Sequence, residues 1–365
     1  MAKVVVGMSG GVDSAVAALL LKEAGYEVVG VLLRTWVADD GTEGRCCEID
    51  DARRVAWKLH IPFLALNCLR DFEESVTRPF IRDYLAGVTP NPCTVCNRAI
   101  KWEKLLYAAN VMQAEFVATG HYASVVHLPN GRYSVQRAVH AEKDQTYMLY
   151  QLSQEMLSRT LMPLATYSKA EVRQMAAAAG LAVADKKDSQ EICFVPDGDY
   201  AGYIRNNSDM PIPGEGNYVD SEGRILGRHQ GILHYTVGQR KGLGIALGHP
   251  VFVKEIRADK NEVVLSEDKD LYGREVLCGE LFFMGAAPLA VGERLPCLAK
   301  VRYRHEAAPA VLEMLDFGRL RIHFEDPVRA AAPGQAAVFY DADGCVLGGG
   351  TILKSETACE ESKEG

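Results

Sequence analysis

The sequence Lys3-Val4-Val5-Val6-Gly7-Met8-Ser9-Gly10-Gly11-Val12-Asp13-Ser14 decides the fold of the first part of the chain. Val4–Val6 is a β-branched run typical of a buried parallel strand. The chain then turns through Gly7–Gly11 and enters an apolar helical pattern that ends at Gly25. A strand, a glycine-rich turn and a helix N-terminus together make an anion site, because N–H groups point outward and glycines let the backbone approach a phosphate.

Two common phosphate-binding motifs do not match this loop. A Walker A loop ends in Gly-Lys-Ser/Thr, and a dinucleotide fingerprint has the pattern Gly-x-Gly-x-x-Gly. Ser9-Gly10-Gly11-Val12-Asp13-Ser14 instead resembles the pyrophosphate loop of the ATP pyrophosphatases. Those enzymes cleave ATP between its α and β phosphates and activate a substrate oxygen by adenylation. The alternative is an ordinary turn of small residues between a strand and a helix.

The composition is that of a globular protein with more than one domain. The chain has 365 residues, of which 48% are hydrophobic and 24% charged, so two or three domains are expected. It has no apolar run of about 18 residues and no signal peptide, so we expect a cytoplasmic protein without a membrane partner. Its 10 cysteines favour catalysis or metal binding over a disulfide framework.

Alternating strand and helix patterns predict a doubly wound parallel α/β sheet in the N-terminal part. Glu27–Leu33 and Phe63–Leu66 are apolar, β-rich runs, and Asp50–His60 between them has a helical pattern. Ligands of such sheets bind beyond the C-terminal ends of the strands. Leu33–Trp36 follows the second strand, where these folds hold a nucleotide base. Cys46-Cys47 lies in a predicted loop, and we assign it no role.

A second candidate site is Thr89-Pro90-Asn91-Pro92-Cys93-Thr94-Val95-Cys96-Asn97, which follows an amphipathic helix predicted at Glu73–Leu85. Its two prolines predict an extended backbone, so we expect Cys93 and Cys96 on an exposed loop that leads into a helix at Arg98–Ala109. A cysteine near a helix N-terminus has a stabilised thiolate and a lowered pKa. The prolines disfavour buried structural thiols, and a four-cysteine zinc site lacks a second spaced pair. Reactive sulfur chemistry or a three-cysteine cluster site remains.

Further polar candidates follow along the chain. Phe116–Tyr122 predicts a strand that runs into a loop at Gly120-His121, where His121 is equally compatible with a structural and a site role. Lys143-Asp144-Gln145 is a polar cluster ahead of a helix, and Cys193 alone would be interpreted as a core thiol. Two local signals predict a hairpin and a helix start: Pro129-Asn130-Gly131 and the capping box Ser168-Lys169-Ala170-Glu171.

The pattern changes beyond residue 200. A linker is marked by Pro211, Pro213, Gly214 and Gly216. Tyr235–Gly244 is a glycine-punctuated basic loop in a small α+β segment, and short strands from about Leu277 predict a barrel or sandwich. We therefore expect an ATP-binding catalytic domain at residues 1–200, a central linker domain at 201–276, a C-terminal β-barrel domain at 277–356 and a tail at 357–365.

The net charge of −8 argues against a nucleic-acid partner unless a local basic patch overturns it. Lys300-Val301-Arg302-Tyr303-Arg304-His305 predicts a basic strand with an aromatic residue. Alternation would place Lys300, Arg302 and Arg304 on one side, which suits phosphate contacts. The alternative is a solvated strand face.

Taken together, these motifs resemble the tRNA-specific 2-thiouridylases over nearly the whole chain. The matching segments are Gly7–Ser14, Asn91–Asn97, Ala118–Tyr122, Lys143–Gln145, Lys187–Phe194, Gly238–Gly244, Arg302–Arg304, Pro333–Gln335 and Gly348–Gly350. These enzymes are tRNA-uridine 2-sulfurtransferases, which replace the carbon-2 oxygen of the wobble uridine by sulfur and convert ATP to AMP and diphosphate. A uracil oxygen is a poor leaving group, so adenylation would supply AMP as a good one.

The resemblance implies roles for individual residues. Cys96 would be the nucleophile and Cys193 the persulfide carrier, loaded by a sulfur-donating protein such as a cysteine desulfurase or persulfide relay. Their reaction would leave a Cys96–Cys193 disulfide, which requires Cα atoms within about 7 Å. The target base must leave the anticodon stack. The implied ATP-binding residues, with Mg²⁺ on the phosphates, are Gly7, Met8, Ser9, Gly10, Gly11, Val12, Asp13, Ser14, Leu33 and Gly120. The implied tRNA contacts are Asn91, Pro92, Cys93, His121, Lys143, Asp144, Gln145, Arg302, Tyr303 and Gln335.

One departure from the family pattern concerns Cys93, which stands where well-known members carry aspartate. Cys93, Cys96 and Cys193 are therefore also candidate ligands of a 4Fe–4S cluster whose fourth iron would hold sulfide. We favour the persulfide over the cluster. Two other classes remain: a C–N-forming ligase of the same superfamily, which would not need Cys96 and Cys193, and a non-catalytic RNA-binding protein, which would lack a working loop.

Overall fold

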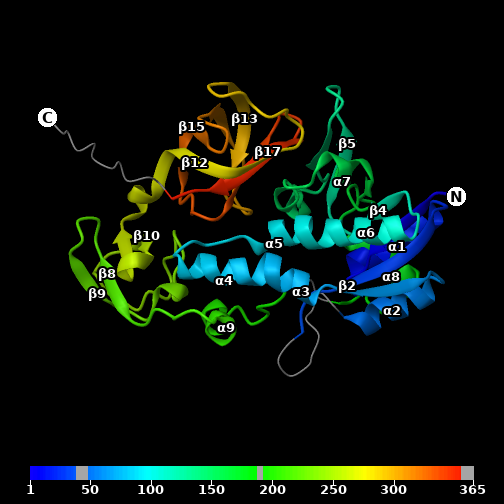
Figure 1. Ribbon diagram of the computed structural model, residues 1–365, viewed down its shortest axis with the longest axis horizontal. Helices are drawn as coiled ribbons and strands as arrows, with labels where there is room; N and C mark the ends of the chain where they lie inside the picture. Colours follow the sequence, from blue (N-terminus) through cyan, green and yellow to red (C-terminus); the bar gives the residue numbers. More distant parts are fainter. Residues whose placement is uncertain (38–47, 187–191, 355–365) are drawn as a thin grey trace.

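The computed structural model describes residues 1–37, 48–186 and 192–354. Within these residues the strands form a parallel sheet of five, a mixed sheet of four, a closed barrel of six and one hairpin. Figure 1 shows the parallel sheet near the N-terminus, the mixed sheet at the opposite end and the barrel beside both. Among the described residues, no helix is both long and apolar enough to span a membrane. The predicted pair Cys46-Cys47 lies outside the described residues.

The parallel sheet has the strand order β3-β2-β1-β4-β7. Its strands are β1 (Lys3–Gly7), β2 (Glu27–Arg34), β3 (Phe63–Asn67), β4 (Phe116–Ala118) and β7 (Thr160–Leu161). The chain builds outward from β1 through β2 to β3 and then returns to place β4 on the other side of β1. The winding direction therefore reverses between β1 and β4, and ligands of doubly wound sheets bind at this point, beyond the strands' carboxyl ends.

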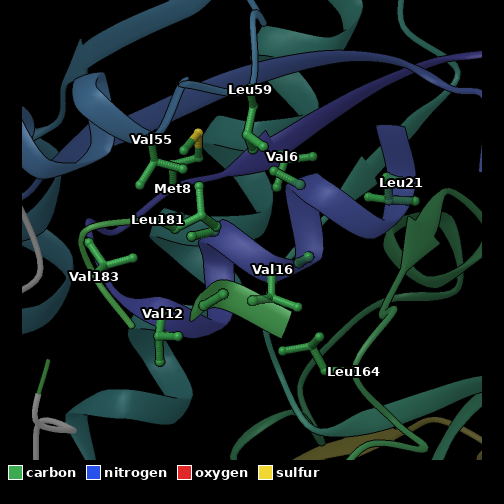
Figure 2. Packing of buried hydrophobic residues seen from close by; sticks show 14 of the residues in the cluster. Val6, Met8, Val12, Val16, Leu21, Val55, Leu59, Leu164, Leu181 and Val183 are labelled. Atoms are coloured by element: carbon green, nitrogen blue, oxygen red, sulfur yellow. The ribbon is translucent and has the colours of Figure 1, made fainter. Parts of the chain in front are cut away.

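The helix that follows β1 is the centre of the N-terminal core. α1 (Val12–Glu23) packs between the sheet and α8 (Lys169–Ala178), while α2 (Ile49–Lys58) packs beside it on the same face. Figure 2 shows Met8, Val12 and Val16 among residues from α2 and from the chain after α8. The prediction of a buried strand followed by an apolar helix is therefore confirmed.

Two long helical segments lie side by side across the molecule (Figure 1), and each contains a π-helical stretch. The first joins α3 (Leu69–Phe72) to α4 (Arg78–Leu85) through π-helical Glu73–Thr77. The second joins α5 (Pro92–Val95) to α6 (Glu103–Val111) through π-helical Cys96–Trp102. π-Helical insertions are rare in proteins overall, but those that occur are often found at functional sites.

The prediction of an exposed loop for the two cysteines is wrong, because Cys93 and Cys96 lie in the first turns of the second helical segment. Asn91 caps this helix by accepting a hydrogen bond from the N–H of Cys93 at 3.3 Å. Pro92 occupies the first helical position, where the missing N–H costs nothing and the fixed φ suits a helix. The proline thus starts the helix instead of extending the chain.

Cys193 is carried by a segment that packs onto these helices. The next residue, Phe194, is 2% exposed and makes edge-on contacts with Phe72, at 5.6 Å between ring centroids, and Phe80, at 5.1 Å. The segment continues into α9 (Tyr200–Asn207), whose Tyr203 ring lies 5.2 Å from that of Phe194. Aromatic packing therefore fixes the position of Cys193 beside the helical segments.

The remaining elements of the N-terminal part are short. The hairpin of β5 (Ala123–His127) and β6 (Tyr133–Arg137) is where it was predicted, and it is followed by α7 (Gln154–Ser158). The predicted capping box is confirmed at Ser168 and Glu171. The predicted strand Phe116–Tyr122 ends at Ala118 in the structure, because Gly120 turns the chain against the backbone of Asp13 and Ser14.

The central part contains a mixed sheet in the order β10-β11-β8-β9. Its strands are β8 (Gly216–Val219), β9 (Ile225–His229), β10 (Phe252–Arg257) and β11 (Glu262–Ser266). Tyr218, which is fully buried, donates its hydroxyl to the carbonyl of Leu243 at 2.6 Å. The basic loop predicted at Tyr235–Gly244 thus covers this sheet.

The C-terminal part is a closed barrel in the order β12-β15-β14-β13-β16-β17. Its strands are β12 (Tyr272–Phe283), β13 (Arg294–Lys300), β14 (Ala308–Met314), β15 (Leu320–Arg329), β16 (Ala336–Tyr340) and β17 (Val346–Ile352). The barrel, not the sandwich, is the correct alternative, and the alternating residues Leu320, Ile322 and Phe324 of β15 lie in its core.

The predicted basic strand Lys300–His305 is wrong, because β13 ends at Lys300 and the chain turns at once. The turn follows from Arg302, whose guanidinium donates to the carbonyl of Ala330 at 3.0 Å and to that of Val237 at 2.8 Å. Arg302 therefore joins the barrel to the central part, and Lys300, Arg302 and Arg304 do not share a strand face.

We expect Phe194→Ala to lower the free energy of unfolding by about 3 kcal/mol, because it leaves a cavity between Phe72 and Phe80. The matched control is Phe317→Ala, since Phe317 is 96% exposed and its loss should cost less than about 0.5 kcal/mol. Urea denaturation measures both values. Equal losses for the two variants would contradict the packing described here.

Candidate active site

The phosphate-binding loop lies at the carboxyl end of β1, at the point where the winding of the sheet reverses. Gly10 has a φ of 77°, a conformation that favours glycine, and Gly11 precedes the first turn of α1. The Ser14 hydroxyl donates to the carbonyl of Gly11 at 3.1 Å and accepts from the N–H of Ser9 at 3.2 Å. These bonds close the loop on itself and leave Ser9 exposed at its tip.

The predicted ATP-binding residues include some whose side chains are buried in the core and others that lie beside the loop. Met8 and Val12 are 3% exposed, and Figure 2 shows their side chains in the core, so only their backbones can face a ligand. Leu33 lies at the end of β2, next to the loop in the sheet. Gly120 approaches the loop closely, because a Cβ at this position would lie 2.7 Å from the carbonyl carbon of Asp13 and the nitrogen of Ser14.

Asp13 is the acidic residue of the loop, and its carboxylate is held from two sides. The Lys169 ammonium lies 2.7 Å from both Asp13 Oδ1 and Oδ2, and the Tyr122 hydroxyl donates to Oδ1 at 2.7 Å. Sequence reasoning identified Asp13 but missed Lys169 and Tyr122. The signal for Lys169 was its place as the first residue after the helix cap Ser168, which gave its position on α8 but not its direction.

A second lysine contacts the same loop. Lys186 donates to the carbonyl of Gly10 at 3.0 Å and to Asp51 Oδ2 at 2.7 Å, and it also pairs with Glu48. Burial lowers the pKa of the Lys186 ammonium. Lys186 thus ties the loop to the start of α2.

The two predicted catalytic cysteines come together on one hydrophobic cluster. Cys96 and Cys193 are both half-buried and pack against the cluster that contains Phe80 and Phe194. Cys93, one helical turn before Cys96, is exposed. The fold thus places two thiols that are distant in sequence on the same hydrophobic cluster, which Leu33 and Leu66 from the ends of β2 and β3 also contact.

The arrangement does not fit the cluster alternative. Within residues 1–37, 48–186 and 192–354, no three His, Cys, Asp or Glu side chains are grouped so that they could hold a metal ion. Cys93, Cys96 and Cys193 therefore do not form the three-thiolate set that a 4Fe–4S cluster requires.

His121 lies between the loop and the cysteine helix. Its Nδ1 is 2.9 Å from the Thr119 hydroxyl, and its ring lies 5.4 Å from that of Trp102, on the π-helical stretch. Burial lowers the pKa of His121 well below its ordinary range, and the charge of Lys101 adds to this effect. The imidazole is therefore neutral near pH 7 and able to donate or accept one hydrogen bond.

The polar cluster Lys143–Gln145 splits into separate roles. Asp144 is buried, and its carboxylate accepts hydrogen bonds from the hydroxyl of Thr146 at 2.8 Å and the N–H of Ala138 at 3.4 Å. Gln145 accepts from the N–H of Tyr122 at 2.9 Å through its side-chain oxygen. Lys143 is half-buried on the same turn. Gln145 thus holds the backbone of the residue whose hydroxyl binds Asp13.

Gln335 of the barrel contacts the segment that starts the cysteine helix. Its amide donates to the carbonyl of Thr89 at 2.8 Å and that of Pro90 at 3.4 Å, and the N–H of Thr89 donates to the carbonyl of Pro333 at 3.0 Å. Gly334 has a φ of 88°, and a Cβ there would lie 2.9 Å from the carbonyl oxygen of Thr89. Asn91 and Pro92 follow immediately, so the barrel supports the first turn of the helix.

The remaining predicted tRNA contacts lie where the barrel meets the other parts. Tyr303 donates its hydroxyl to the carbonyl of Asp144 at 3.2 Å, and the Lys300 ammonium lies 5.6 Å from the centre of the Tyr303 ring. Burial lowers the pKa of Arg302, and the charge of Arg329 lowers it further. Arg304 is exposed. Of the basic residues predicted for phosphate contact, Arg304 is the one that faces solvent most openly.

The fold and the loop together define the class of this protein. The doubly wound sheet carries a glycine-rich phosphate loop at its switch point, with a mixed sheet and a barrel after it. The family models that match describe a "tRNA methyl transferase HUP domain" at residues 2–197, a "tRNA methyl transferase PRC-barrel domain" at 209–267 and an "Aminomethyltransferase beta-barrel domain" at 274–352. The chain is thus a three-part protein with an ATP-using HUP domain.

Curated relatives narrow this class to one family. A tRNA-specific 2-thiouridylase MnmA of Lachnoclostridium phytofermentans is 51% identical over 97% of this chain and 100% of its own. One from Acetivibrio thermocellus is 48% identical over 96% of this chain and 99% of its own. The chain therefore belongs to the tRNA-specific 2-thiouridylase family.

Solved structures are more distant. The U34-tRNA thiolase NcsA from Methanococcus maripaludis, solved with its 4Fe–4S cluster, is 18% identical with a TM-score of 0.36, over 56% of this chain and 66% of that one.

We expect Arg302→Ala and Arg304→Ala to act differently. Arg302→Ala leaves two carbonyls without their donor and should lower the free energy of unfolding by about 1–3 kcal/mol, whereas Arg304→Ala should leave stability unchanged. If Arg304 contacts a phosphate, its loss should reduce the slope of log affinity for tRNA against log salt by about one. Urea denaturation and filter binding over a range of salt measure the two effects. Equal destabilisation by the two variants would contradict the placement of Arg302.

Proposed function

We propose that the protein catalyses the ATP-dependent 2-thiolation of the wobble uridine of tRNA, with sulfur carried as a persulfide on Cys193. One observation supports the proposal most strongly: Cys96 and Cys193 share a hydrophobic cluster next to the sheet edge that carries the phosphate loop. The names of the relatives point to the same reaction. We place this reaction in the cytoplasm.

The first step is adenylation. ATP, with Mg²⁺ on its phosphates, would bind along Gly7–Ser14, with its base near Leu33 and its phosphates near Gly120. The carbon-2 oxygen of the flipped uracil forms a bond to the α-phosphorus, and the bond from this phosphorus to the bridging oxygen breaks. Pyrophosphate leaves with that electron pair, and carbon 2 then carries AMP as a leaving group.

The second step transfers sulfur. The terminal sulfur of the Cys193 persulfide attacks carbon 2 and expels AMP, which leaves the base joined to Cys193 through a disulfide. The Cys96 thiolate then attacks the Cys193 sulfur, so that 2-thiouridine departs and a Cys96–Cys193 disulfide remains. An external dithiol or thiol pair must reduce this disulfide before the next cycle. A sulfur-donating protein, a cysteine desulfurase or a persulfide relay, would then reload Cys193.

We assign tRNA contacts to residues at the start of the cysteine helix and at the junctions between the parts. Asn91, Pro92 and Cys93 start the cysteine helix, and His121 stands between this helix and the loop. The neutral His121 could hydrogen-bond a flipped base without adding charge. Lys143–Gln145, Arg302, Tyr303 and Gln335 lie along the junctions between the parts and would position the anticodon stem. Within the described parts of the chain, the cluster alternative lacks a three-cysteine site. A C–N-forming ligase is the more distant alternative.

The mechanism predicts unequal effects of three cysteine substitutions. Cys96→Ser and Cys193→Ser should each lower thiolation at least about a hundredfold, because each thiol takes part in bond exchange. Cys93→Ser should retain substantial activity, because Cys93 lies exposed outside the shared cluster. Thiolated uridine formed per enzyme, counted by mass spectrometry of digested tRNA, is the measurement.

The control is Cys278→Ser, whose thiol is buried in the barrel core with its pKa raised by burial, and which should remain active. Loss of activity in Cys93→Ser equal to that in Cys96→Ser, together with iron in the anaerobic parent protein, would overturn the persulfide route. AMP release without any response to tRNA would overturn the thiolation itself.

A further inference from the structure

The phosphate loop of this protein carries no positive charge of its own. Gly7–Ser14 contains one ionisable side chain, the carboxylate of Asp13. The pyrophosphate released by adenylation is strongly anionic, and enzymes that transfer phosphoryl or adenylyl groups stabilise such charge with Lys, Arg or metal ions. A Walker A loop provides its own lysine for this purpose, whereas this loop does not. Any cationic side chain at this site therefore comes from outside the loop.

Asp13 cannot bind pyrophosphate directly, because two anionic groups in contact repel each other. Its carboxylate instead holds a cation against the loop. The Lys169 ammonium lies 2.7 Å from both oxygens of Asp13, and the Lys169 side chain is only 14% exposed. The hydroxyl of Tyr122 donates to Asp13 Oδ1 at 2.7 Å and so fixes the carboxylate from a second side.

The other lysine on the loop fits this role less well. Lys186 pairs with Glu48 and with Asp51 Oδ2 at 2.7 Å, both of which lie outside the loop, and it donates to the carbonyl of Gly10 at 3.0 Å. Its charge is already met by acidic residues of the flanking segment, and its bond to Gly10 shapes the backbone. Lys169, in contrast, is held by a residue of the loop itself.

We propose that Lys169 is the pyrophosphate-binding cation of this enzyme and that Asp13 is its positioning residue. The inference rests on the proposed function, because it assigns a role within ATP cleavage. In the complex with ATP, the Lys169 ammonium is shared between Asp13 and an oxygen of the β or γ phosphate. As the bond to the α-phosphorus breaks, the electron pair goes to the bridging oxygen, and Lys169 neutralises the charge that develops on the leaving pyrophosphate.

The position of Lys169 at the start of α8 fixes its ammonium relative to Asp13. Ser168 caps this helix and Glu171 completes the capping box, so the backbone at Lys169 is fixed before any ligand binds. α8 also packs against α1, whose first turn contains Asp13. A pre-positioned ammonium requires little reorganisation when charge develops, and this is how fixed cations contribute to catalysis.

The test compares ligands that differ only in the phosphates. Isothermal titration gives the dissociation constants of ATP, pyrophosphate and AMP for the full-length wild type, Lys169→Met and Lys169→Arg. Lys169→Met should weaken ATP and pyrophosphate by about tenfold or more and leave AMP within about twofold, because AMP lacks the phosphates that Lys169 contacts. Lys169→Arg should recover part of the loss. The matched control is Lys104→Met. Lys104 forms an ion pair with Asp71 at 2.6 Å and has no contact with the loop among those described, so this variant should leave all three constants unchanged.

Two results would overturn the proposal. One is ATP and pyrophosphate binding by Lys169→Met within about twofold of wild type. The other is equal weakening of ATP and AMP, which would mean that the Lys169–Asp13 pair only shapes the loop. Asp13→Asn provides a second check that does not depend on the lysine variant: combining it with Lys169→Met should add no further loss, because Asp13 acts through Lys169.

The proposed function is tested separately in the same preparation. Wild-type protein that binds ATP and pyrophosphate as expected but releases no AMP in response to tRNA would contradict the thiolation reaction while leaving the assignment of Lys169 intact. If Lys169→Met releases AMP in response to tRNA at the wild-type rate, this contradicts the assignment of Lys169 but not the proposed thiolation reaction.

Discussion

The contact of Phe194 with Phe72 and Phe80 is the constraint on which sulfur chemistry in this protein depends. Cys96 and Cys193 belong to segments far apart in sequence, and neither segment could place its thiol alone. Burying an aromatic ring stabilises a fold by a few kcal/mol and has definite geometry, so it can hold a neighbouring residue in register. Cys193 follows the position of Phe194, and Cys96 follows the helical segment that packs beside Phe80. Core packing thus places both thiols on one hydrophobic cluster.

A chain of hydrogen bonds links the side of the molecule predicted to bind tRNA with the phosphate loop. Gln145 holds the backbone of Tyr122, Tyr122 binds Asp13, and Asp13 holds Lys169. On the other side, Gln335 and the turn before it support Thr89 and Pro90 at the start of the cysteine helix. The barrel therefore touches the catalytic part at the segment that carries Cys96. A tRNA bound at the barrel and the junctions would therefore be linked by a few hydrogen bonds to the phosphate loop and to the cysteine helix.

Much of this architecture could be predicted from the sequence, because local signals specify it. The buried strand, the glycine loop and the helix after it depend on short-range patterns, and the capping box at Ser168 is a local hydrogen-bond motif. The helix start at the cysteine segment could not be predicted, because Pro92 is compatible with both an extended chain and a helix start, and the cap by Asn91 decides between them. The strand expected at Lys300–His305 failed because Arg302 bonds to carbonyls from two distant segments. Lys169 could not be found for the same reason, since its partner is remote in sequence.

The central claim is that Cys193 delivers sulfur to a base activated by ATP while Cys96 resolves the product. The most direct measurement is a single turnover with enzyme that carries radioactive sulfur as a persulfide on Cys193, kept without iron and without reductant. The account predicts that label passes to tRNA only when ATP is added, that AMP forms in equal amount, and that mass spectrometry then finds a Cys96–Cys193 disulfide. Transfer of label without ATP, or full transfer with both thiols still reduced, would contradict it.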